Sequence, residues 1–175
     1  HYGTPFEVNP NISQEGVKDY MNAICRHSPR SYQVEGVYDA LRHNRKLLIS
    51  PTASGKSLMI YSIVRYFVEK GKNTLIVVPT TSLVEQMYKD FADYGWDVGS
   101  FCHKIYAGRE RETNSQVIIT TWQSIYKLPR KYFERFNVVV GDEAHQFKSK
   151  SLISIMTKLA DAKYRYGFTG TLDGT

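Results

Sequence analysis

Short apolar runs alternate with amphipathic stretches along most of the chain. The apolar runs predict strands near 46–50, 74–79, 98–105, 117–121, 137–142 and 164–169. Apolar residues at three- and four-residue steps predict helices near 13–26, 31–43, 56–70, 82–94, 122–127 and 149–161. Because strands and helices alternate, the sequence predicts an α/β fold with a mainly parallel sheet covered on both faces. Ligands of such sheets bind beyond the carboxyl ends of the strands.

Length and composition fit a compact domain. The chain has 175 residues, of which 42% are hydrophobic. Its apolar runs are much shorter than the ~20 residues of a membrane span, and no signal peptide is visible. Cys25 and Cys102 have no metal-ligand spacing, so free thiols in a reducing cytoplasm are expected. We expect residues 30–175 to form the domain, and residues 1–29 to be a leader or the tail of a preceding domain in a longer protein.

The charge of the chain favours a polyanionic partner. The net charge is +6, with a pI near 9.2. From residue 127 to 165 there are nine basic residues against four acids, and a basic face that is merely solvated is the alternative. The basic residues are Lys127, Arg130, Lys131, Arg135, Lys148, Lys150, Lys158, Lys163 and Arg165.

Residues 50–57, which read SPTASGKS, have the features of a phosphate-binding loop. They lie between an apolar run and an amphipathic stretch, in the strand, loop and helix order that such a loop needs. Lys56 would reach the terminal phosphates and the Ser57 hydroxyl would ligate Mg²⁺. Ser50 stands where the usual pattern has glycine, and a polar turn that caps a helix is the alternative. The nucleotide contacts predicted here are Thr52, Ala53, Ser54, Gly55, Lys56 and Ser57.

A pair of acids follows the β-branched run at residues 138–140. Asp142 would hold Mg²⁺, directly or through water, and Glu143 would polarise the attacking water. An exposed acidic turn is the alternative, which the phosphate loop upstream disfavours. Lys56, Asp142 and Glu143 are therefore the predicted catalytic residues. Lys56 and Asp142 are expected to converge from neighbouring strand ends on one metal-bound triphosphate.

Four further segments, taken with these two, resemble the ordered motifs of superfamily 2 helicases. Gln33 lies upstream of the loop, where that family has a glutamine that hydrogen-bonds the adenine edge. Residues 142–145 read DEAH, the form of motif II in one branch of the family. Residues 78–86 and 119–124 resemble its strand-binding motifs, and residues 168–171 resemble motif III. Each segment alone also suits a helix cap, a turn or a surface position, so the order of the motifs carries the resemblance.

The resemblance implies a RecA-like P-loop NTPase domain that uses ATP and Mg²⁺. In the family, the loops after two strands hold the sugar-phosphate backbone of DNA through main-chain N–H groups and hydroxyls. The matching residues here are Pro79, Thr80, Thr81, Thr120 and Thr121. The residues expected to relay the nucleotide state to that face are His145, Thr169 and Thr171.

Residues 79–81, 121–123 and 150–155 resemble in particular the UvsW-type recombination and repair helicases of T-even-like phages. That likeness implies a motor in the host cytoplasm that remodels single-stranded or branched DNA and unwinds RNA–DNA hybrids, with no membrane partner. In the family, a second RecA-like domain supplies arginines to the γ-phosphate, and such a contact is worth roughly 10³–10⁵ in rate. We therefore expect this piece alone to bind nucleotide weakly and to hydrolyse it poorly.

Three other functions fit parts of the pattern. A motor subunit of a restriction or excision-repair complex shares these motifs and differs in appended domains. A nucleotide-gated DNA-binding module would use ATP as a conformational latch without unwinding. A P-loop metabolic kinase would have a phosphate-acceptor pocket and no basic face.

Overall fold

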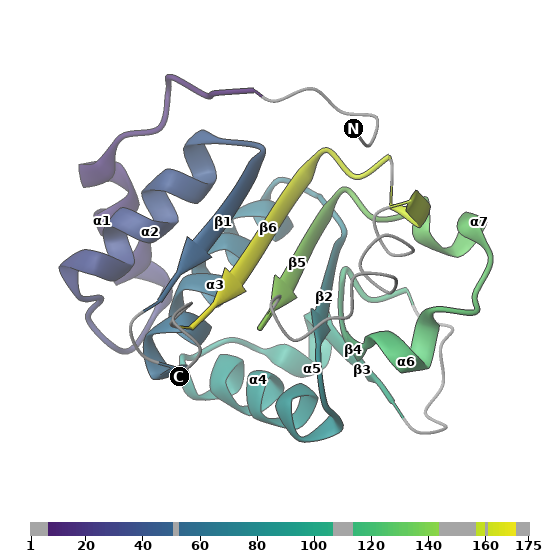
Figure 1. The fold of residues 1–175 in the computed structure, drawn as a ribbon. Helices are drawn as coiled ribbons and strands as arrows, with labels where there is room; N and C mark the ends of the chain where they lie inside the picture. Colours follow the sequence, from purple (N-terminus) through teal and green to yellow (C-terminus); the bar gives the residue numbers. More distant parts are fainter. Residues whose placement is uncertain (1–6, 51–52, 107–113, 144–156, 160, 171–175) are drawn as a thin grey trace.

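Six parallel strands form one sheet in the computed structural model, which describes residues 7–50, 53–106, 114–143, 157–159 and 161–170 (Figure 1). The strand order is β1-β6-β5-β2-β4-β3, and every pairing is parallel. The predicted α/β class with a parallel sheet is confirmed. The strands are β1 (Arg45–Ile49), β2 (Thr74–Val78), β3 (Cys102–Ile105), β4 (Val117–Thr121), β5 (Val138–Asp142) and β6 (Tyr164–Thr169).

Helices cover both faces of this sheet. One face carries α1 (Gln14–Ile24), α2 (Ser31–Arg42), α3 (Ala53–Glu69), α4 (Thr81–Asp93) and the short α5 (Val98–Phe101). The other face carries α6 (Trp122–Ile125) and α7 (Arg130–Phe133). No helix in the described ranges has the length and apolar character needed to cross a membrane.

Side-chain alternation along the strands divides the core in two. In β2, Ile76 and Val78 pack with α3 and α4, whereas Leu75 and Val77 pack with α6 and α7. All four are at most 1% exposed, and full burial of such a side chain contributes about 1.5–3 kcal/mol. This explains why β2 reads as a continuous apolar run rather than an alternating one.

Helix α3 is buried on nearly all sides. Every residue from 55 to 64 is buried, because the helix lies between the sheet and α1, α2 and α4. Tyr61 on α3 donates a hydrogen bond of 2.5 Å to the carbonyl of Ile24 at the end of α1. Val17 and Met21 of α1 belong to the same core. Helix α1 thus packs directly on α2 and α3. The domain boundary at residue 29 stays a prediction.

Two sequence predictions need correction or fall outside the described residues, and one helix was not predicted. The strand predicted at 98–105 begins only at Cys102, because the backbone N–H and hydroxyl of Ser100 both donate to Asp97 and close a helical turn first. Helix α7 was missed, since a four-residue helix after Pro129 is too short to show a helical period. The helix predicted at 149–161 lies mostly outside the described residues.

The strand order also corrects one expectation about the site. β1 and β5 were expected to be neighbours, but β6 lies between them and pairs with both. Ser50, which follows β1, donates its backbone N–H to the carbonyl of Thr169 on β6 at 2.9 Å. The start of the phosphate loop is therefore attached to β6, and Lys56 must reach across the end of that strand to approach Asp142.

Candidate functional site

Lys56 lies between two carboxylates at the carboxyl edge of the sheet. Its Nζ is 3.2 Å from Asp142 Oδ1 and 2.7 Å from Glu143 Oε1. Lys56 is 5% exposed and Asp142 3%, so this charge cluster is largely removed from water. The predicted convergence of Lys56 and Asp142 is confirmed, from the first turns of α3 and the end of β5.

The environment of Asp142 changes its titration. Burial raises the pKa of this carboxyl above its ordinary value, and the nearby Glu143 raises it further, while Lys56 acts in the opposite direction. With both acids ionised, the two carboxylates and one ammonium carry one net negative charge. The cluster is therefore suited to an additional cation.

Glu143 has an uncommon backbone conformation. Its φ of 52° lies in the left-handed region, which residues other than glycine adopt rarely. Such strain is found mostly at functional sites, where the surrounding structure holds it in place. A Cβ built at Gly170 would lie 4.0 Å from Glu143 Oε1, so the segment that follows β6 passes directly beside this carboxylate.

Ser57 forms a hydrogen bond with a residue that no sequence motif indicated. Its Oγ is 2.5 Å from the hydroxyl of Tyr94, the C-cap residue of α4. Both residues line a cavity of about 350 Å³ that also contacts Lys56, Asp142 and Glu143. Tyr94 lies 37 residues along the chain from Ser57 and belongs to no recognisable motif, so only the fold could reveal the contact.

Gln33 is buried against the phosphate loop. Its Nε2 donates to the carbonyl of Gly55 at 3.3 Å, and its Oε1 accepts from the backbone N–H of Arg30 at 2.7 Å. A side-chain amide has two N–H donors and two acceptor lone pairs, so these bonds leave capacity for another partner. Its predicted contact with adenine stays a prediction.

The two loops predicted to contact DNA lie side by side but differ in exposure. Val78 at the end of β2 pairs with Thr121 at the end of β4, which places the following segments next to each other. Thr80 and Thr81 are exposed, and Thr80 caps α4 by accepting from the backbone N–H of Leu83 at 3.3 Å. Pro79 is half-buried.

The second of these loops offers little side-chain surface. Thr120 is fully buried and donates to the carbonyl of Thr121 at 3.0 Å, and Thr121 is 4% exposed with its hydroxyl 2.8 Å from that of Ser124. The exposed neighbour in this segment is Gln123. The role of this loop in DNA binding stays a prediction. Its contacts with DNA would come from the backbone more than from the two threonine hydroxyls.

The remaining predicted residues are only partly described. Thr169 is 1% exposed, and its carbonyl bonds the start of the phosphate loop. Gly55 is buried within the first turn of α3. Ala53 and Ser54 belong to the same turn, but their side chains lie outside the described part of the structure. Thr52, His145 and Thr171 lie outside the described residues.

The donor set fits magnesium held together with a phosphate group. Ser57 and Asp142 supply a hydroxyl and a carboxylate, which are hard oxygen ligands, and the buried Asp142 carboxylate already lies 3.2 Å from one cation, the Lys56 ammonium. Within the described ranges, no group of three or more metal-binding side chains forms a complete cage. Mg²⁺ usually takes one or two carboxylates and completes its shell with water and substrate phosphates, so two protein ligands suffice.

Comparisons with known proteins identify the family of the chain. The family model described as "Type III restriction enzyme, res subunit" matches residues 26–174. The ATP-dependent DNA helicase uvsW of Enterobacteria phage T4 is 35% identical over 153 residues, which are 84% of this chain and 30% of that protein. The DNA 3'-5' translocase XPB2 of Sulfurisphaera tokodaii is 32% identical over 143 residues, 81% of this chain and 30% of that protein.

A solved structure has the same fold. The crystal structure of the UvsW helicase from bacteriophage T4 superimposes with a TM-score of 0.86 at 30% identity, covering 97% of this chain and 64% of that one. The predicted resemblance to superfamily 2 helicases of the UvsW type is therefore confirmed.

Fold and site together define the class of this protein. A buried loop lysine that meets an acid pair at the carboxyl edge of a parallel sheet is the arrangement of a RecA-like P-loop domain of the helicase type. The chain belongs to the family described as "Type III restriction enzyme, res subunit". It spans about 30% of the length of the curated relatives it matches.

Proposed function

We propose that this chain is the first motor domain of an ATP-dependent DNA helicase or translocase. The observation that carries the proposal is the buried Lys56 ammonium within 3.2 Å of both Asp142 and Glu143, at the edge of the sheet where such folds bind nucleotide. Family membership and the names of two relatives, a DNA helicase and a DNA translocase, support it.

In this proposal, each polar group of the site has a distinct task. Lys56 binds the terminal phosphates, and Ser57 and Asp142 would hold Mg²⁺. Magnesium, when bound, neutralises charge on the phosphate oxygens. Glu143 orients a water molecule toward the γ-phosphate and accepts its proton on the carboxylate. The left-handed backbone at Glu143 and its ion pair with Lys56 hold that carboxylate in place.

The finer parts of the proposal concern partners. DNA, either single-stranded or branched, would contact the loops that begin at Pro79 and Thr120, and RNA–DNA hybrids are a further substrate class. A second RecA-like domain of the same parent protein would complete the site from the opposite side. The host cytoplasm would be the place of action if the parent, like the phage T4 relative, is a phage protein.

A motor subunit of a restriction complex is the second candidate, because the matching family carries that description. It needs the same ATPase site, so the two candidates differ in the rest of the parent protein. Strand-displacement assays on forked DNA, compared with nuclease assays on the same DNA, separate them.

DNA-stimulated ATP hydrolysis by the full-length protein tests the site. Lys56→Ala is expected to lower turnover by roughly a hundredfold or more, because a preorganised cation is lost from the phosphates. Glu143→Gln is expected to bind ATP and leave it uncleaved. Lys18→Ala and Glu35→Gln change exposed residues on α1 and α2 and serve as controls. Near-normal DNA-stimulated hydrolysis by both site variants would reject the assignment.

A further inference from the structure

The hydroxyl of Tyr94 is held in a fixed position beside the phosphate loop. The Tyr94 ring lies 5.1 Å from the ring of Tyr61 and 5.7 Å, edge to face, from that of His27. The Tyr94 carbonyl accepts from the backbone N–H of Arg26 at 3.0 Å. Ring and backbone are thus both restrained, and the hydroxyl that these contacts position is the one 2.5 Å from Ser57 Oγ.

The chemistry of a serine ligand explains why such a neighbour matters. A serine hydroxyl has one O–H donor and two acceptor lone pairs. When the oxygen ligates a cation it uses a lone pair, so its hydrogen must point away from the metal to an acceptor. Ser57 is 8% exposed, which limits the water available for that purpose, and the oxygen of Tyr94 is in reach.

We propose that Tyr94 is a positioning residue that accepts the hydrogen of Ser57 and turns a Ser57 lone pair toward the magnesium of the bound nucleotide. The proposal rests on the proposed function, since it needs Ser57 as a magnesium ligand. Outer-shell partners of metal ligands orient them in this way, and their loss typically weakens metal binding by 10–100-fold. No motif of the sequence contains Tyr94, so this role is separate from those expected of the loop and the acid pair.

Nucleotide affinity measured with and without magnesium tests the role of Tyr94. In the full-length protein, Tyr94→Phe keeps the ring and removes only the oxygen. Titration with a fluorescent ADP over a magnesium series should show a loss of about tenfold in magnesium-dependent affinity. Affinity in EDTA should stay unchanged, because the phosphate contacts of Lys56 and the loop remain.

Two further variants make the result specific. Ser57→Ala should lose the same magnesium dependence, and the double variant should be no weaker than Ser57→Ala alone. Tyr20→Phe is the matched control, because it removes a tyrosine hydroxyl that bonds Glu69 at 3.1 Å on the exposed surface. Thermal unfolding of each variant checks that the domain remains folded.

The possible failures are distinguishable. If Ser57→Ala weakens magnesium-dependent binding and Tyr94→Phe does not, only the role of Tyr94 is overturned. The same holds if Tyr94→Phe lowers affinity equally in EDTA, or lowers it further in the Ser57→Ala background. If Ser57→Ala itself leaves the magnesium dependence intact, the magnesium assignment in the proposed function falls, and the role of Tyr94 falls with it.

Discussion

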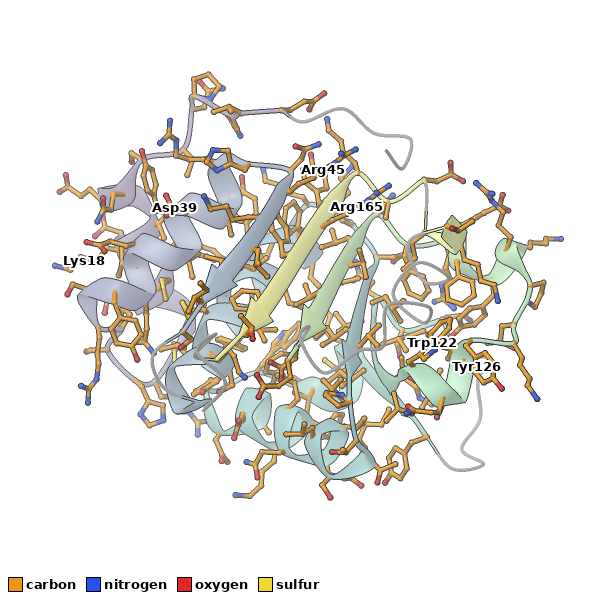
Figure 2. The ribbon with its side chains drawn as sticks, viewed as in Figure 1. Lys18, Asp39, Arg45, Trp122, Tyr126 and Arg165 are labelled. Atoms are coloured by element: carbon orange, nitrogen blue, oxygen red, sulfur yellow. The ribbon has the colours of Figure 1, made fainter. Side chains whose placement is uncertain are left out.

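Charged residues are arranged in opposite ways at the two edges of the sheet. At the carboxyl edge, Lys56 lies within 3.2 Å of two carboxylates that come from the end of β5. At the amino edge, Arg45 of β1 and Arg165 of β6 occupy paired positions of the two strands and lie beside each other (Figure 2). One edge thus gathers opposite charges, and the other gathers like charges.

Backbone carbonyls, rather than acids, accept the hydrogen bonds of Arg165 at the amino edge. Arg165 is 6% exposed and donates from Nε to the carbonyl of Ala162 at 2.9 Å and from Nη2 to that of Leu159 at 3.3 Å. Burial, together with the neighbouring Arg45, lowers the pKa of Arg165. The Nε and Nη2 of Arg45 are buried without a hydrogen-bond partner, as far as the described residues extend.

The difference separates charge used for chemistry from charge used for the fold. Arg165 anchors the segment before β6 by satisfying two carbonyls, which is a structural task. Lys56 instead pairs with two side-chain carboxylates, so three ionisable groups lie close together. Variants at the carboxyl edge should therefore change activity and pH dependence, whereas variants at the amino edge should change stability.

The largest expected effect on stability is that of Arg165→Met. The substitution keeps much of the apolar stem but removes both guanidinium hydrogen bonds, and the carbonyl of Leu159 keeps only the backbone N–H of Ala162. Hydrogen bonds to a charged group contribute about 1.5–3 kcal/mol each, so a loss of about 3 kcal/mol in the free energy of unfolding is expected. Urea unfolding measures it, with the exposed Arg130→Met as control. A loss no larger than that of the control would contradict the structural role of Arg165.

Local patterns in the sequence predicted the strands of the fold but not their order in the sheet. Continuous apolar runs such as Leu75 to Val78 identify buried parallel strands, because both faces of the sheet are covered. The short α5 and α7 were not predicted, since one turn gives at most a single step of the helical period, although α6 of the same length lies within the helix predicted at 122–127. The placement of β6 between β1 and β5 depends on the packing of the whole sheet, which local pattern does not encode.

The site was predictable where its chemistry is local. Lys56, Ser57, Asp142 and Glu143 lie in two short motifs, and the rule that ligands bind at strand ends was enough to bring Lys56 and Asp142 together. Tyr94 could not be predicted, because its contact with Ser57 depends on where α4 ends relative to α3. The pairing of Arg45 with Arg165 could not be predicted either, because it depends on the register of β1 with β6.

A smaller effect is expected at the carboxyl edge from Asp142→Asn, and it should depend on pH. The pKa of Asp142 is raised in the folded protein, chiefly by burial, so between the unfolded value of about 3.9 and the folded value the folded state binds the proton more readily. The stability associated with this group is therefore highest below about pH 4 and falls as the pH rises through the folded pKa.

Urea unfolding in EDTA, from about pH 4 to 7, measures this linkage. The amide of the variant does not titrate, so its stability relative to the wild type should improve as the pH rises from about 4 toward the folded pKa of Asp142 and change little above that pKa. Asp161→Asn at an exposed position is the control and should show no such trend. A stability difference that is constant with pH, or that moves against the variant as the pH rises, would show that Asp142 is not held above its ordinary pKa.

The smallest expected effect comes from Arg45→Gln, which tests whether the like charges at the amino edge oppose each other. Removing one of two like charges on paired strands should raise the free energy of unfolding by roughly 0.5 kcal/mol. The gain should vanish in the Arg165→Met background, where no repulsion remains, and it should change little with NaCl, because salt screens buried charges only weakly. If Arg45→Gln instead lowers stability, and does so equally in both backgrounds, Arg45 stabilises the fold by its own contacts, and the contrast between the two edges would then rest on Arg165 alone.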